Sequence, residues 1–132
     1  MNVLIIGSGG REHALAWKSA QDEDVQNVYV CPCKAGTHLE NKISNFDVDS
    51  NNFEAIESFC MDKLIDLVII GPEQPLVMGL SDYLQSKGIN VFGPSKSAAQ
   101  LEGSKTFSKD FFIKYNIPTA GYKSFDNYEH AL

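Results

Sequence analysis

The chain has 132 residues, which suits one ordinary domain with a single core and is too short for two full domains. Its 17 acidic and 11 basic side chains give a formal net charge of -6 with no cluster of basic residues, so we expect no nucleic acid and no membrane partner. With 43% apolar residues and no apolar run near the ~18 needed for a membrane span, a cytoplasmic globular protein is predicted. A small anionic ligand in a local pocket is compatible with these numbers.

The three cysteines, Cys31, Cys33 and Cys60, form no recognisable metal or redox motif. Cys31 and Cys33 are separated by one residue, which is the wrong spacing for a zinc knuckle, and His38 is the one histidine near them. We therefore predict free thiols in a reducing compartment and no metal ligand in this chain.

The first third of the chain alternates short apolar runs with a helical pattern. Residues 3–6 form an apolar, mostly β-branched run that leads into the glycine-rich residues 7–10, as expected of a strand buried on both faces and followed by a tight turn. A helix is predicted over residues 11–19, a second strand over residues 28–31, and a weak third strand over residues 42–48.

The alternation continues to about residue 92. Asn51 forms a predicted capping box with Glu54, and the helix that follows places four apolar side chains on one face. These are Phe53, Ile56, Cys60 and Leu64. A clear strand covers residues 67–70, one helical stripe runs through residues 76–84, and a last strand covers residues 90–92. Strands and helices in this order predict an α/β fold with a parallel, doubly wound, Rossmann-like sheet.

From residue 104 the pattern changes, so we place a domain boundary there: residues 1–103 form the α/β domain and residues 104–132 begin another. Another helix carries Phe107, Phe111, Phe112 and Tyr115, and we interpret the three phenylalanines as core residues. Pro118 ends this helix and residues 121–125 suggest a strand. Asp126 and Glu129 then cap a helix that has room for only about two turns, which predicts a truncated second domain.

Ligands of parallel α/β sheets bind at the carboxyl ends of the strands, and three loops lie there. In the first, the glycines of residues 7–10 allow close approach of the backbone, and the start of the next helix offers free N–H groups to an anion or polar group. A strand-to-helix turn without a ligand is the alternative, with Arg11 and His13 as ordinary surface residues. As a dinucleotide motif the loop fails, since Glu12 stands at the third glycine position and no acidic residue follows the second strand.

The second and third loops add a carboxylate and two small residues. Glu73 lies between Pro72 and Pro75, and a carboxylate fixed there suits the hydroxyls of a ribose better than its phosphate. The alternative is that Glu73 only caps the next helix. The third loop, residues 32–37, could close over the same crevice. Trp17 is interpreted as helix-to-sheet packing, whereas Lys105 stands at a helix start that disfavours a cation.

Taken together, these motifs resemble the phosphoribosylamine–glycine ligase family, also called glycinamide ribonucleotide synthetase, of the ATP-grasp superfamily. The matching motifs cover the chain in family order: Gly7-Ser8-Gly9-Gly10-Arg11-Glu12-His13, Gly71-Pro72-Glu73-x-Pro75-Leu76, Phe92-Gly93-Pro94, Gln100-Leu101-Glu102-Gly103-Ser104-Lys105 and Ile117-Pro118-Thr119-Ala120. The third loop departs from the usual Pro-Gly-Asn-Ala-Gly-Thr, because Cys33 and Lys34 replace the glycine and asparagine.

The resemblance implies an ATP-dependent ligase that uses Mg²⁺ or Mn²⁺. ATP would phosphorylate the carboxylate of glycine, and the amine of 5-phosphoribosylamine would attack the acyl phosphate to give glycinamide ribonucleotide, ADP and phosphate. It further implies substrate-binding roles for Gly9, Gly10, Arg11, Gly36, Thr37 and Glu73, and contact of Lys105 with the ATP phosphates. The metal ligands and catalytic residues would lie in the remainder of the ATP-grasp fold, so this chain alone is predicted to be inactive.

Three alternatives stay open at this point. One is another purine-pathway ATP-grasp ligase that uses formate or bicarbonate in place of glycine. A second is a nucleotide-binding oxidoreductase module, which Glu12 disfavours. The third is a binding protein without catalytic activity.

Overall fold

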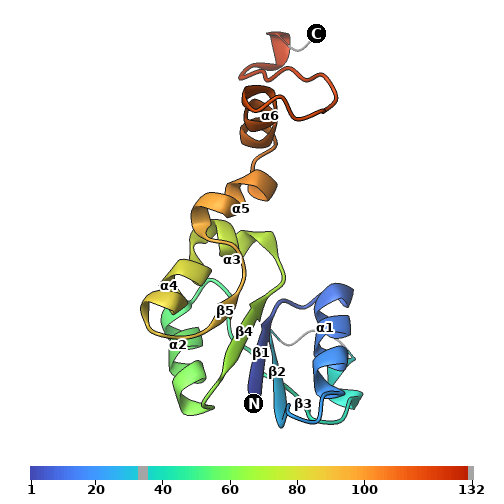
Figure 1. Cartoon of the computed structure of the whole chain (residues 1–132), viewed down its shortest axis with the longest axis vertical. Helices are drawn as coiled ribbons and strands as arrows, with labels where there is room; N and C mark the ends of the chain where they lie inside the picture. Colours follow the sequence, from blue (N-terminus) through green and yellow to red (C-terminus); the bar gives the residue numbers. More distant parts are fainter. Residues whose placement is uncertain (33–35, 131–132) are drawn as a thin grey trace. The chain divides into compact units, whose positions relative to one another are not determined.

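The computed structural model describes residues 1–32 and 36–130. The described residues of Met1–Ala99 form a parallel sheet with helices on both faces (Figure 1). In chain order the elements are β1 (Asn2–Ile6), α1 (Gly10–Ala20), β2 (Asn27–Cys31), the 3₁₀ turn η1 (Thr37–Leu39), β3 (Ile43–Asn45), α2 (Phe53–Asp62), β4 (Leu67–Ile70), α3 (Glu73–Met78), α4 (Leu80–Ser86), β5 (Val91–Phe92), α5 (Lys96–Gly103), α6 (Lys105–Lys114) and the 3₁₀ turn η2 (Tyr128–His130). Two compact units, Met1–Ala99 and Gln100–Leu132, divide the chain within α5, four residues before the boundary that the sequence predicts.

The five strands of the first unit run in the order β3-β2-β1-β4-β5, and each neighbouring pair is parallel. The chain builds outward from β1 to β2 and β3, and then returns to the other side of β1 with β4 and β5. The predicted doubly wound, Rossmann-like α/β fold is confirmed. The order of the strands reverses direction between β1 and β4, which is where such sheets bind ligands.

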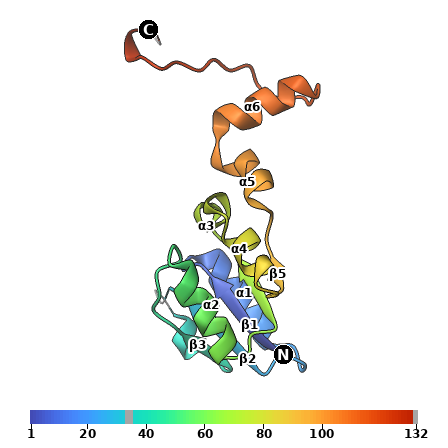
Figure 2. The same ribbon diagram turned by 90° about the vertical axis from the view of Figure 1, so that its left-hand side faces the viewer.

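The core has two layers because alternate residues of β1 face opposite sides of the sheet. Leu4 and Ile6 pack with α2 and α4, whereas Val3 and Ile5 pack with Ala16 of α1. Figures 1 and 2 show α1 on one face of the sheet and α2 on the other. A strand covered on both faces carries apolar residues at every position, which explains the continuous run that the sequence shows.

Three details of the predicted helices differ from the structure. Asn52, not Asn51, caps α2: its side chain accepts a hydrogen bond from the backbone N–H of Ala55. Leu64 lies beyond the end of α2 with a positive φ and an exposed side chain, so its place on the helical face was wrong. The stripe through residues 76–84 is two helices, α3 and α4, because Gly79 adopts φ 104° between them.

The interpretation of Trp17 and of the aromatic residues of α6 as core was wrong. The side of α1 that faces the sheet is formed by Glu12 and Ala16, and Trp17 points away and is 49% exposed. Phe107 is 39% exposed, and Phe111 and Phe112 are half-buried. In the second unit, a single short helix cannot cover the large apolar side chains that it carries.

The second unit contains α6 and an extended segment. Ser104 caps α6 by accepting a hydrogen bond from the backbone N–H of Phe107. Residues 121–125 are not a strand, and the described part of this unit offers them no strand to pair with. Asp126 does not begin an α-helix either: η2 is a 3₁₀ turn in which the Asn127 side chain accepts from the Glu129 N–H. Within the described ranges, no helix is long and apolar enough to cross a membrane.

Candidate functional site

Three loops leave the sheet side by side, because the strands before them end in register. Ile6 at the end of β1 pairs with Cys31 of β2 and with Ile70 of β4. The alignment continues one residue further: the Gly7 N–H donates to the Cys31 carbonyl at 2.6 Å, and the Gly71 N–H donates to the Ile6 carbonyl at 2.9 Å. The loops after β1, β2 and β4 therefore begin at one edge, where the strand order reverses.

Glu12 lies beneath the first of these loops. It is only 4% exposed, and its carboxylate accepts hydrogen bonds from the Gly9 backbone N–H and from Arg11 Nε, both at 2.8 Å. Burial works against the ionised carboxyl, but the hydrogen bonds from Arg11 and Gly9 outweigh it and hold the pKa of Glu12 below its usual value. The Gly9 N–H is therefore used by the protein itself, although we expected the N–H groups at the start of this helix to be free for a ligand.

Two glycines make room for this side chain. A Cβ on Gly7 would lie 2.4 Å from Glu12 Cγ, and a Cβ on Gly71 would lie 2.2 Å from Glu12 Oε1. Glu12 thus packs against the loops that follow β1 and β4 at the same time. Sequence reasoning missed this role, although the spacing of Gly9 and Glu12 is that of the first and last residues of a capping box.

The third loop approaches the start of α1 through Gly36. Gly36 has φ 37°, and a Cβ there would lie 3.3 Å from Cε1 of His13. His13 also faces Glu40, with 3.5 Å between Nε2 and Oε1. Thr37 is buried and donates from Oγ1 to Asn45 Oδ1 at 2.6 Å, so its hydroxyl proton is used within the chain. Cys33 and Lys34, where the loop departs from the family pattern, lie outside the described residues.

Glu73 stands at the start of α3, directly after Pro72, and its side chain is exposed. Pro75 is buried in the first turn of the same helix, which fixes the backbone on which Glu73 is carried. The site therefore presents an exposed carboxylate, the Arg11 side chain at 59% exposure, and open space above Gly10 among the described residues. A carboxylate that accepts and a guanidinium that donates suit a ligand with several hydroxyl or amine groups.

Lys105 belongs to the second unit. It is the first residue of α6, and its side chain is exposed. The structure gives this lysine no role. Among the described residues, no three histidine, cysteine or acidic side chains gather in a way that could hold a metal ion. Cys31 and Cys60 are free buried thiols.

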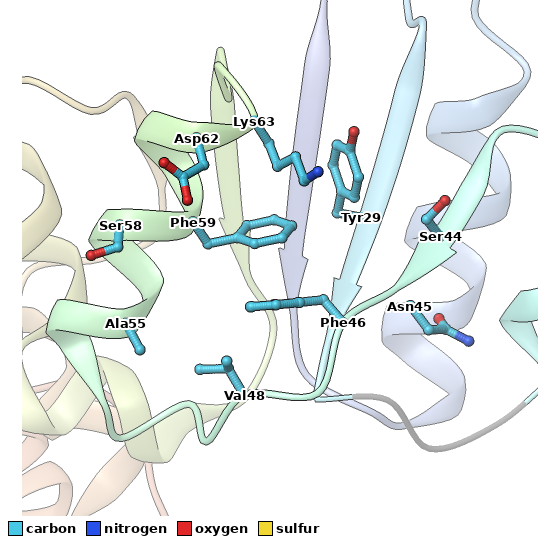
Figure 3. A pocket seen from close by; sticks show the side chains of 10 residues that line it. All are labelled: Tyr29, Ser44, Asn45, Phe46, Val48, Ala55, Ser58, Phe59, Asp62 and Lys63. Atoms are coloured by element: carbon cyan, nitrogen blue, oxygen red, sulfur yellow. The ribbon is translucent and has the colours of Figure 1, made fainter.

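A cavity of about 730 Å³ lies elsewhere in the first unit, between α2 and the β2–β3 edge of the sheet (Figure 3). Sequence reasoning did not predict it, and no described residue of the three loops lines it. Phe46 stacks on Phe59 with their centroids 3.9 Å apart, and Tyr29 meets Phe59 edge-on at 5.3 Å. These rings contact one another, so much of their apolar surface is already used.

The fold and the three aligned loops define the class: a Rossmann-like α/β domain whose parallel strands end at one edge, where such sheets bind ligands. Residues 1–102 match the family model described as "Phosphoribosylglycinamide synthetase, N domain". The chain belongs to this family.

Relatives of known name agree with this assignment. Over all 132 residues the chain is 54% identical to a phosphoribosylamine–glycine ligase of Vibrio cholerae and 54% identical to one of Pseudomonas putida, and it covers 31% and 30% of their lengths. It therefore spans about a third of the length of the curated relatives it matches.

Two solved structures share the fold. Phosphoribosylglycinamide synthetase from Anaerococcus prevotii superposes with TM-score 0.64 and 23% identity over 98% of this chain and 32% of that one. N5-carboxyaminoimidazole ribonucleotide synthetase from Thermotoga maritima superposes with TM-score 0.69 and 20% identity over 98% of this chain and 35% of that one.

Proposed function

We propose that the three loops bind 5-phosphoribosylamine. Together with the segments that full-length relatives carry, this chain would form an ATP-dependent ligase that joins glycine to that amine. The observation that carries the proposal is the arrangement of the loops after β1 and β4, which pack on the same buried Glu12. In this proposal the arrangement holds the backbone at Glu73 near the glycine backbone at the start of α1.

In this proposal Glu73 accepts hydrogen bonds from the ribose hydroxyls, as an ionised carboxylate can from two neighbouring donors. Gly9, Gly10 and Arg11 line the opposite side, and Gly36 and Thr37 complete it from the loop after β2. Residues 1–103 would form the substrate-binding domain and residues 104–132 the start of the ATP-grasp domain. Lys105 would approach the ATP phosphates.

ATP would supply the phosphoryl group that activates the carboxylate of glycine, with Mg²⁺ or Mn²⁺ bound at the phosphates. The described residues contain no cluster of metal ligands, so they do not fit a resident metal site. We assign the metal and most of the ATP contacts to residues outside this chain. Binding and orientation of the sugar is the part of the reaction that these residues perform.

Calorimetric titration with ribose 5-phosphate tests this proposal. Loss of the hydrogen bonds to a charged carboxylate costs about 1.5–3 kcal/mol, so Glu73→Ala is expected to weaken binding about tenfold or more. Glu54→Ala is the matched control, because Glu54 is also an exposed carboxylate in the first turn of a helix, and it should leave binding unchanged. ATP with Mg²⁺ should not bind. Equal binding by both variants, or no ribose 5-phosphate binding by the folded protein, would contradict the proposal.

A further inference from the structure

Glu12 occupies the place where an anion would otherwise be attracted to this fold. A glycine-rich loop that leads into a helix N-terminus normally binds phosphate, because its backbone N–H groups are unpaired and the helix dipole is positive there. Here the carboxylate of Glu12 accepts the hydrogen bond from the Gly9 N–H at 2.8 Å. It also pairs with Arg11, whose Nε lies 2.8 Å from Oε1. One carboxylate therefore engages two groups that could attract an anion.

The geometry leaves Glu12 little freedom to withdraw. Its side chain is 4% exposed and fills the space above Gly7 and Gly71, where a Cβ would meet its atoms at 2.2–2.7 Å. Its pKa is held below the usual value, so it carries a full negative charge at neutral pH. An incoming phosphate at Gly9 would meet that charge and find its first backbone donor taken.

We propose that Glu12 is a specificity-determining residue: it keeps phosphate away from the loop after β1 and reserves that loop for the hydroxyl and amine end of the ligand. The identity of the ligand rests on the proposed function, but the exclusion of phosphate does not. In this orientation the sugar meets Gly9, Gly10 and Glu73, and its phosphate points away from the start of α1. The same residue explains why a dinucleotide pyrophosphate does not fit, since it stands at the third glycine position of the G-x-G-x-x-G motif.

The test is a titration with inorganic pyrophosphate and, in parallel, with ribose 5-phosphate. Glu12→Gln keeps the size of the side chain and removes its charge, so the pyrophosphate affinity should rise about tenfold, as expected for a unit charge removed several ångströms from an anion near the surface. Glu23→Gln changes the net charge equally in the exposed turn after α1, and should change that affinity less than about twofold. A purely structural role for Glu12 predicts no gain.

Two further measurements cover a variant that fails to fold. Glu12→Gly removes the side chain beneath the loop altogether and should show the same gain in pyrophosphate affinity. In the unmodified protein, the Arg11 Nε–H proton should exchange slowly with solvent, because the buried carboxylate accepts it. No gain in pyrophosphate affinity by a folded variant, or exchange as fast as in a free arginine, would overturn the proposal.

The two proposals fail in different ways. If the unmodified protein does not bind ribose 5-phosphate but Glu12→Gln gains pyrophosphate affinity, the assigned ligand is wrong and the role of Glu12 stands. If ribose 5-phosphate binds and no gain is seen, the role of Glu12 is wrong and the proposed function stands.

Discussion

Replacing Gly71 by alanine tests the contact that joins the two principal loops of the site. The new Cβ would lie 2.2 Å from Glu12 Oε1, 2.6 Å from Cγ and 2.7 Å from Cδ. The Glu12 side chain is almost fully buried and accepts hydrogen bonds from Gly9 and Arg11, so it cannot move aside without breaking them. Gly71→Ala is therefore expected to destabilise the first unit.

The magnitude follows from these contacts. An overpacked side chain costs about 1–3 kcal/mol, and each lost hydrogen bond to a buried carboxylate costs about 1.5–3 kcal/mol. If the Glu12 side chain moves, the clash is relieved but the hydrogen bonds are lost, so the two costs do not simply add. We expect Gly71→Ala to lower the free energy of unfolding by about 2–4 kcal/mol, a large share of the 5–15 kcal/mol typical of a domain.

Urea unfolding followed by circular dichroism and by the fluorescence of Trp17, the single tryptophan, measures this loss. Gly10→Ala is the matched control, because no described atom lies within 4 Å of its added Cβ, and alanine there should be neutral or stabilise by up to about 1 kcal/mol. In a Glu12→Ala background, Gly71→Ala should cost at least about 1 kcal/mol less than in the unmodified protein. Equal costs in both backgrounds, or equal stability of the two alanine variants, would refute the reasoning.

Four titratable groups give three further predictions. Hydrogen bonds hold the pKa of Glu12 below its usual 4.5, so its contribution to stability is complete above that pH and is lost as the pH falls through the lowered value. Glu12→Gln should therefore lose less stability in acid than the unmodified protein does. Equal losses in the two proteins would contradict this. The hydrogen bond to Glu57 raises the pKa of Tyr83 to about 12. Glu57→Gln should therefore bring the pKa of Tyr83, measured by carbon NMR, back toward 10. An unchanged pKa would exclude the hydrogen bond as the cause. Burial raises the pKa of Cys31 and Cys60 to about 11, so iodoacetamide at about pH 8 should label these two thiols only after unfolding. Rapid labelling of the two thiols in the folded protein would show that they are accessible.

The sheet could be predicted because its central strands, which are covered on both faces, carry continuous apolar runs. The runs in β1 and β4 are buried on both faces, and no other element of this length gives that pattern. Once parallel strands alternate with helices, the loops after them are placed at one edge without further information. The locations of Gly9, Gly36 and Glu73 at that edge followed from this argument, whereas their binding roles stay predictions.

The missed features depend on contacts between distant residues. Gly79 lies within an apolar stripe that one helix or two could produce, and only the packing of α3 and α4 selects the break. The sequence shows Glu12 only as a departure from the dinucleotide motif. Its contact with Gly71 joins residues far apart in the chain, so the sequence pattern does not reveal it. Trp17 is exposed because Ala16, not the larger neighbour, faces the sheet, a choice that depends on the distance between helix and sheet.

We propose that the loops after β1, β2 and β4 form one binding site. Mapping the changes in backbone amide NMR shifts during titration with ribose 5-phosphate tests it most directly, because every loop is observed at once. We expect shifts that saturate together at Gly9, Gly36 and Glu73. Shifts confined to the cavity beside α2, at residues such as Ser58 and Lys63, or to the second unit, would contradict it.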